Sequence, residues 1–127
     1  MKPFEYTIDK LQKALLQLKD GAERAVDDLG RDAVIQRFEF TCELFWKAIK
    51  VVLDHDGYSC QSPRSCIKEG VRRGLLCGGQ TLLDMLQDRN MTSHLYSEAM
   101  AEEIYQRIKA TYINLLEDNL QQIRSRL

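Results

Sequence analysis

The sequence predicts an all-α fold: an antiparallel, up-and-down bundle of about five helices in a single domain over residues 1–127. Three observations support this prediction. Apolar residues recur at steps of three and four, no segment alternates with a period of two, and short breaks containing Gly or Pro separate the helical stretches. With 44% hydrophobic and 29% charged residues, a chain of this length can bury one core.

The N-terminal half contains two long predicted helices. We expect the first over residues 5–29, where apolar positions form one stripe, with Gly30 as its C-cap. Asp32 would cap a second helix, which runs to about residue 55 or 56. Because this helix is apolar on two faces, we expect it to be central or to lie at an interface, and we predict a homodimer or a complex with another subunit. Its second apolar face consists of Val34, Phe40, Leu44, Ala48 and Val51.

Three further helices complete the prediction. Ser62-Pro63 opens a short third helix, with the serine as cap and the proline at the first position, and this helix ends near Gly74. A fourth helix is expected from about Gln80, after the Gly78-Gly79 break. The last helix begins near Ser97 and runs almost to the C-terminus.

Charge and cysteine content exclude some classes of protein. The net charge of -1 gives no bulk attraction to nucleic acid, so RNA contact requires a local patch. The third helix carries a basic stripe that consists of Arg64, Lys68 and Arg72. These side chains either are simply solvated or contact the phosphates of a nucleotide or RNA. Because no Cys-x-x-Cys pair is present, we expect no metal site and no cofactor. In a reducing cytosol we expect free thiols at Cys42, Cys60, Cys66 and Cys77.

We expect a cytoplasmic protein that does not enter membranes. No apolar run approaches the ~20 residues needed to span a bilayer. The first residues also lack the apolar segment of a signal peptide.

The segment from Asp88 to Tyr96 concentrates the reactive side chains. Arg89 can bind a phosphate with a planar fork of donors, and His94 can exchange a proton near neutral pH. Asn90 and His94 are one helical turn apart, and the long side chain of Arg89 can reach the same place. This spacing is compatible with a shared anion site. If the anion were an RNA phosphate, His94 would act as base or acid and Arg89 would stabilise the transition state, with a second proton-transfer group supplied by a dimer partner.

Two glutamates of the second helix are candidate supporting residues. Glu39 and Glu43 share one helix face, and Glu43 also lies four residues before Lys47, the favourable order for an ion pair. They either form a solvated face or hold Arg89 and orient His94. In the purely structural alternative, His94 is hydrogen-bonded at a helix end, and Arg89 pairs with Asp88, Asp84 or a glutamate of the second helix.

Several motifs together resemble the HEPN superfamily and, within it, the small bacterial nucleotidyltransferase substrate-binding proteins. The motifs are Phe38-Glu39, Glu43-Leu44-Phe45-Trp46-Lys47, Ser62-Pro63-Arg64, Leu83-Asp84-Met85-Leu86 and Asp88-Arg89-Asn90-x-x-Ser93-His94-x-Tyr96. The resemblance implies a helical bundle that dimerises, similar to the substrate-binding helical domain of kanamycin nucleotidyltransferase. It also implies a separately encoded partner, a minimal nucleotidyltransferase.

The resemblance implies two alternative functions. In one, the chain is the substrate-binding subunit and binds a nucleotide or other substrate through the Arg-x4-His-x-Tyr region, with Asn90, Ser93 and Tyr96 as binding or modified residues. In the other, it is a metal-independent ribonuclease toxin that uses Arg89 and His94, and the nucleotidyltransferase is an antitoxin that adenylylates Tyr96. The chain lacks the Gly-Ser turn and paired aspartates on strands that nucleotidyl transfer needs, so we expect none of that activity from it alone. A third alternative is a helical interaction protein in which the motif is a structural cap.

Overall fold

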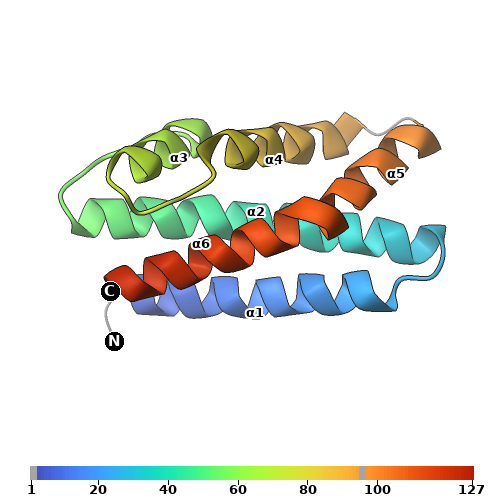
Figure 1. The fold of residues 1–127 in the computed structure, drawn as a ribbon, viewed down its shortest axis with the longest axis horizontal. Coiled ribbons are helices and arrows are strands. Elements are labelled where there is room, and N and C mark those ends of the chain that lie inside the picture. Colours follow the sequence, from blue (N-terminus) through green and yellow to red (C-terminus); the bar gives the residue numbers. More distant parts are fainter. Residues whose placement is uncertain (1–2, 95–96) are drawn as a thin grey trace.

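The computed structural model describes residues 3–94 and 97–127, which form helices and, within these ranges, no strands (Figure 1). The predicted bundle of about five helices is confirmed, because the last three segments form one continuous helix with a π-helical turn in its middle. The elements are α1 (Pro3–Arg24), α2 (Asp28–His55), α3 (Pro63–Arg72), α4 (Gly79–Met91), the 3-10 turn η1 (Thr92–His94), α5 (Glu98–Arg107), the π-helical turn η2 (Ile108–Tyr112) and α6 (Ile113–Arg126).

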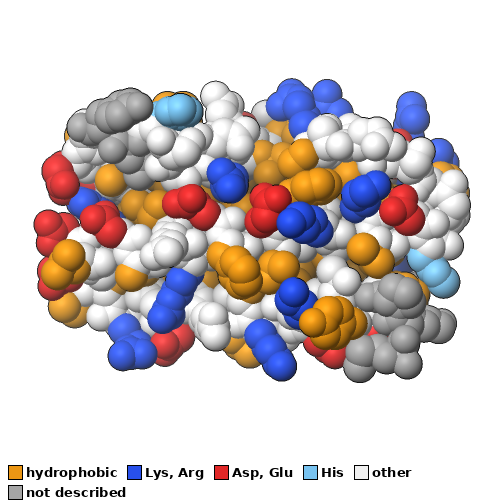
Figure 2. Space-filling model, turned by 180° about the vertical axis from the view of Figure 1, so that it is seen from behind, with side chains coloured by type: hydrophobic (Ala, Val, Ile, Leu, Met, Phe, Trp, Pro, Cys, Tyr) orange, Lys and Arg blue, Asp and Glu red, His pale blue; other side chains and the backbone are white. Residues whose placement is uncertain are grey.

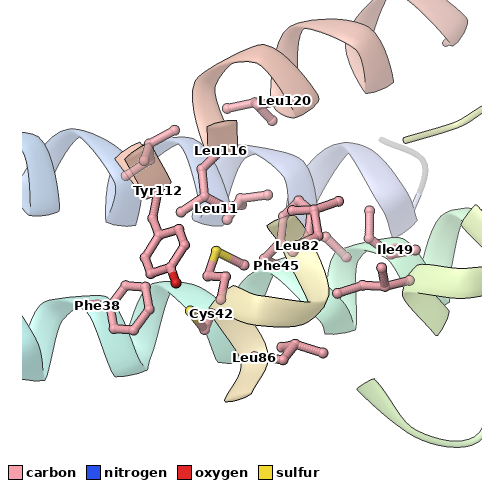
Figure 3. Packing of buried hydrophobic residues seen from close by; sticks show 14 of the residues in the cluster. Leu11, Phe38, Cys42, Phe45, Ile49, Leu82, Leu86, Tyr112, Leu116 and Leu120 are labelled. Atoms are coloured by element: carbon pink, nitrogen blue, oxygen red, sulfur yellow. The ribbon is translucent and has the colours of Figure 1, made fainter. Parts of the chain in front are cut away.

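The longest helix, α2, lies in the middle of the bundle. It contacts α1, α3, α4 and α5, while α6 packs against α1. In Figure 1, α3 and α4 follow one another along one side of α2, and α1 runs along the other side. The apolar side chains of all these helices meet in one core, in which Phe38, Phe45 and Ile49 of α2 are fully buried. Figure 3 shows part of this core, where the rings of Phe38 and Tyr112 stack with centroids 5.6 Å apart.

The boundary between α1 and α2 differs from the prediction. The first helix ends at Arg24 rather than near residue 29, and Gly30 lies inside the first turn of α2 instead of capping α1. Asp27, not Asp32, is the N-cap: its side chain accepts a hydrogen bond from the Gly30 backbone N–H at 2.8 Å. The apolar stripe misled the prediction because its last member does not join the core: Leu29 is 77% exposed.

Two polar contacts attach the later helices to the rest of the bundle. Arg31, a buried side chain near the start of α2, contacts Glu98 at 2.8 Å and Glu102 at 3.7 Å in α5. The fully buried Asn119 of α6 accepts from the backbone N–H of Cys77 and donates to its carbonyl, at 2.9 and 3.0 Å. These bonds fix the α3–α4 connection on α6. Among the described helices, none has the length and apolar character required to cross a membrane.

Candidate functional site

A pocket of about 490 Å³ opens between α2, the start of α3 and α4. Its apolar part contains the single tryptophan of the chain, and its polar part contains two arginines. Figure 2 shows this face of the molecule, where hydrophobic side chains are visible in a hollow that has basic and acidic side chains around it. The lining residues are Cys42, Glu43, Trp46, Ser62, Pro63, Arg64, Leu83, Leu86, Gln87, Arg89 and Asn90.

Helical spacing explains which side chains of α2 and α4 reach the pocket. Cys42 and Trp46 are one turn apart on α2. On α4, Leu83, Leu86 and Asn90 follow at steps of three and four, so they share one helix face. The indole Nε1 of Trp46 is enclosed by protein and has no hydrogen-bond partner in the described chain. The ring therefore offers mainly apolar surface to the pocket.

The third wall is the start of α3, and local chemistry holds it in place. Ser62 and Ser65 form a capping box: the Ser65 backbone N–H donates to Ser62 Oγ at 3.1 Å, and the Ser62 backbone N–H donates to Ser65 Oγ at 3.0 Å. Pro63 occupies the first turn, as predicted. A disulfide between Cys60 and Cys66 closes the same segment. The expectation of four free thiols is therefore wrong for this pair, because the turn into α3 brings two cysteines six residues apart within bonding distance.

Arg89 lies beside a glutamate of α2 in the pocket. Its Nη2 atom is 4.0 Å from Oε2 of Glu43, and Oε1 of Glu43 is 3.7 Å from the Nζ atom of Lys47. Both distances exceed hydrogen-bond length, so the carboxylate is shared loosely between two cations. The side chain of Arg89 is 30% exposed and that of Glu43 is 40% exposed, which leaves both accessible from solvent.

The remaining predicted site residues lie elsewhere or outside the described ranges. His94 is exposed in η1 and is not among the residues that line the pocket. Ser93 is exposed as well, and its hydroxyl donates to the carbonyl of Asn90 at 3.0 Å. Glu39 is half-buried on α2 and does not line the pocket. Tyr96 falls outside the described residues. The structure thus brings together Arg89, Asn90 and Glu43, and places His94 and Ser93 on the turn that follows.

Asp88, which precedes Arg89, is hydrogen-bonded by two side chains of the C-terminal helix. Arg107 donates two hydrogen bonds to its carboxylate, at 2.7 and 2.9 Å, and the hydroxyl of Tyr112 donates a third. Burial raises the pKa of the Tyr112 phenol, and its hydrogen bond to Asp88 raises it further. The bidentate contact likewise raises the pKa of Arg107. Tyr112 therefore stays neutral, and the network fixes α4 against η2.

The thiol of Cys42 contributes apolar surface rather than nucleophilic chemistry. Burial raises its pKa far above the ordinary value, and the carboxylates of Glu43 and Glu39 add to this effect, while the guanidinium of Arg89 opposes it. Because only the thiolate is a strong nucleophile, Cys42 is inert at neutral pH. No group of three or more His, Cys, Asp and Glu side chains in residues 3–94 and 97–127 is arranged to hold a metal ion.

Reasoning from the sequence missed most of the pocket wall. Trp46, Leu83, Leu86 and Gln87 were not expected to lie around Arg89. One signal was available, since Trp46 lies three residues after Glu43 and so falls near the same helix face. The participation of the Ser62–Arg64 segment depends on how the α2–α3 connection folds back, which no local pattern encodes.

Comparisons with known proteins agree with this arrangement of helices. A family model described as "Nucleotidyltransferase substrate binding protein like" matches residues 4–125. The chain is also similar to a protein from Thermus thermophilus whose crystal structure is known. The two are 37% identical, the TM-score is 0.83, and the match covers 90% of this chain and 98% of that one. No curated protein sequence matches the chain.

Proposed function

The chain belongs to the nucleotidyltransferase substrate binding protein like family, and on that premise we propose that it is the helical substrate-binding subunit of a two-component nucleotidyltransferase complex. Its substrate, a nucleotide or another molecule, binds in the pocket beside Arg89 and Asn90. The observation that carries this proposal is the pocket itself, which combines an arginine and an asparagine from the predicted motif with an apolar wall. Substrate sites commonly pair apolar surface with a few convergent polar groups.

The catalytic machinery for nucleotidyl transfer would come from the partner, a minimal nucleotidyltransferase. The test is co-expression with such a nucleotidyltransferase from the same genome, followed by size-exclusion chromatography at micromolar concentration. Co-elution supports the proposal, and separate elution of the two proteins contradicts it. Arg89→Ala is expected to leave co-elution intact and to reduce transfer to substrate by the complex. Arg24→Ala, which removes an exposed arginine outside the pocket, is the control.

A homodimer is part of this proposal, and the second face of α2 supports it. Val34 and Ala48 of that face are buried within the bundle, but Phe40 is 56% exposed and Leu44 is half-buried. A large exposed aromatic side chain next to further apolar surface is typical of interfaces. Sedimentation equilibrium of the wild type and of Phe40→Asp tests this: we expect a dimer and a monomer, respectively. A monomeric wild type contradicts the dimer.

One observation favours a second function, a metal-independent ribonuclease with Arg89 and His94 as its catalytic residues. His94 is exposed on the turn that directly follows the helix of Arg89, so its imidazole is accessible to an RNA backbone. In this function the nucleotidyltransferase would be an antitoxin that adenylylates Tyr96. Cleavage of RNA in the presence of EDTA by the wild type, lost in His94→Ala, would support it. Equal cleavage by both proteins would exclude His94 as a catalytic residue.

A further inference from the structure

We propose that Glu43 is a built-in counterion of Arg89, and that a ligand must displace it by presenting a phosphate attached to a flat, apolar body. The inference rests on the proposed function, because it concerns the same pocket. It identifies the class of substrate and the residue that tunes affinity for it. Glu43 and Arg89 both line the pocket, from α2 and α4, respectively.

The contact between Glu43 and Arg89 is weak enough for an anion to replace it. At 4.0 Å it is longer than a hydrogen bond, and both side chains are partly exposed. Ion pairs of this kind contribute roughly 0–1 kcal/mol. A phosphate oxygen that accepts two parallel N–H bonds from a guanidinium forms a shorter and stronger contact. Exchange of Glu43 for a phosphate at Arg89 is therefore favourable.

The displaced carboxylate has a cation to receive it. Lys47 lies one helical turn after Glu43, and their charged atoms are already 3.7 Å apart. The Glu-to-Lys order at this spacing is the stabilising one on a helix. Lys47 is more than half exposed, so a tighter pair between the two can form at the solvated side of the helix without burying a charge.

The charges around the pocket favour an anion and disfavour a polycation. Two arginines, Arg64 and Arg89, and one carboxylate, Glu43, line the pocket, and the Lys47 ammonium lies 3.7 Å from Glu43. Arg64 is exposed and forms no ion pair within the described chain. A polyamine such as an aminoglycoside would find one carboxylate in the pocket lining, and Arg89 and Lys47 already lie beside it. Electrostatic complementarity of this sign selects anions and rejects cations.

The apolar part of the pocket determines the rest of the ligand. Trp46, Leu83 and Leu86 offer a surface on which a flat ring can lie while its phosphate reaches Arg89. An indole face is a good stacking partner for a nucleobase. Gln87 and Asn90 add neutral donors and acceptors at the margin. Adenosine 5'-monophosphate is therefore a suitable probe of the whole class.

The test is isothermal titration calorimetry at constant ionic strength with adenosine 5'-monophosphate, adenosine, inorganic phosphate and kanamycin. We expect the monophosphate to bind more tightly than adenosine or phosphate, and kanamycin not to bind. We expect Glu43→Gln to bind the monophosphate about two- to fivefold more tightly than the wild type, the factor that corresponds to removing a weak surface ion pair. The matched control is Glu117→Gln, which removes a partly exposed carboxylate paired with Lys19 outside the pocket.

Four results would overturn the proposal. Weaker binding by Glu43→Gln would mean that Glu43 positions Arg89 instead of competing for it, and unchanged binding would mean that Glu43 does not act on the site. Tighter binding of kanamycin than of the monophosphate, or no monophosphate binding at all, would exclude the substrate class. Co-elution with the nucleotidyltransferase is measured separately. A protein that co-elutes but does not bind the monophosphate would contradict the ligand class alone, whereas loss of co-elution would contradict the proposed function. Equal melting temperatures of the variants and the wild type verify that folding is intact.

Discussion

The hydroxyl of Tyr112 in η2 donates a hydrogen bond to the carboxylate of Asp88 in α4. Asp88 directly precedes Arg89, and its side chain is only 14% exposed. Arg107 binds the same carboxylate with two hydrogen bonds from the solvent side. The C-terminal helix thus holds the end of α4, and with it the backbone of Arg89, at a fixed place beside α2.

Replacing the Tyr112 hydroxyl tests this attachment. Tyr112→Phe keeps the ring that stacks on Phe38 and removes the hydrogen bond to a charged acceptor. Because Asp88 keeps its contacts with Arg107, we expect a loss of about 1–2 kcal/mol in the free energy of unfolding, measured by urea denaturation. The matched control is Tyr6→Phe, at a tyrosine that is 59% exposed, for which we expect no change. Equal losses in both variants would show that the bond contributes nothing specific.

The same tyrosine predicts a loss of stability at high pH. Its pKa in the folded state lies above its ordinary value of about 10, so the folded state retains a proton that the unfolded state releases. This contribution is fully present below about pH 10 and is lost as the pH rises further, at up to ~1.4 kcal/mol per pH unit. Above pH 10 we expect the free energy of unfolding to fall more steeply with pH in the wild type than in Tyr112→Phe. Cys42, whose pKa is also raised, contributes equally to both proteins and cancels in the comparison. The measurement is urea denaturation of both proteins at a series of pH values. If the free energy of unfolding fell equally with pH in the two proteins above pH 10, the prediction would be contradicted.

The disulfide between Cys60 and Cys66 is expected to stabilise the α3 wall of the pocket. Cross-linking a loop of this size restricts the unfolded chain and contributes roughly 2 kcal/mol. We expect dithiothreitol to lower the melting temperature of the wild type and to change the fluorescence of Trp46, which lines the same pocket as Ser62 and Arg64. Cys66→Ser should melt at the lower temperature with or without reductant. Cys77→Ser, at an exposed free thiol, should respond to reductant like the wild type.

Asn119 provides the largest expected effect on stability. Its amide forms three hydrogen bonds, two with the backbone of Cys77 and one with the carbonyl of Leu115. Asn119→Leu leaves the two Cys77 backbone groups without these partners, so we expect a loss of about 2–4 kcal/mol in urea denaturation. Asn119→Asp keeps the acceptor and loses the donor, and it should therefore also destabilise the fold. A change below about 0.5 kcal/mol in the leucine variant, the usual range of a surface substitution, would show that water replaces these bonds.

The sequence predicted the helices well, because burial alone imposes the period of the apolar residues. Phe38, Phe45 and Ile49 occur at helical spacing and all lie in the core. The start of α2 was misplaced because Asp27 and Asp32 are both good caps locally, and only tertiary packing decides between them. Arg89, Asn90 and Glu43 were named from their chemistry, and the structure places all three around one pocket.

The rest of the site depends on contacts between distant segments. Trp46 and Arg64 lie in different helices, and nothing in the local sequence states that both line the same cavity. The pairing of Asp88 with Tyr112 spans 24 residues and depends on the path of the C-terminal helix. The disulfide was missed because the expected reducing environment, rather than the spacing of Cys60 and Cys66, decided the prediction.

The π-helical turn η2 makes the length of the C-terminal helix as important as its composition. In this turn the backbone N–H of Ile113 bonds to the carbonyl of Ile108, five residues earlier, which accommodates one residue more than an ordinary helical turn. Deleting one of the exposed residues Lys109 and Ala110 would restore the usual turn and leave the residues after it on the helix faces that they now occupy. A deletion in the regular helix between Ile113 and Asn119 would instead rotate everything after it by about 100°. After a deletion between Ile113 and Asn119, the side chain of Asn119 could no longer reach the backbone of Cys77. A single-residue deletion at Lys109 or Ala110 should therefore be tolerated, whereas one between Ile113 and Asn119 should not.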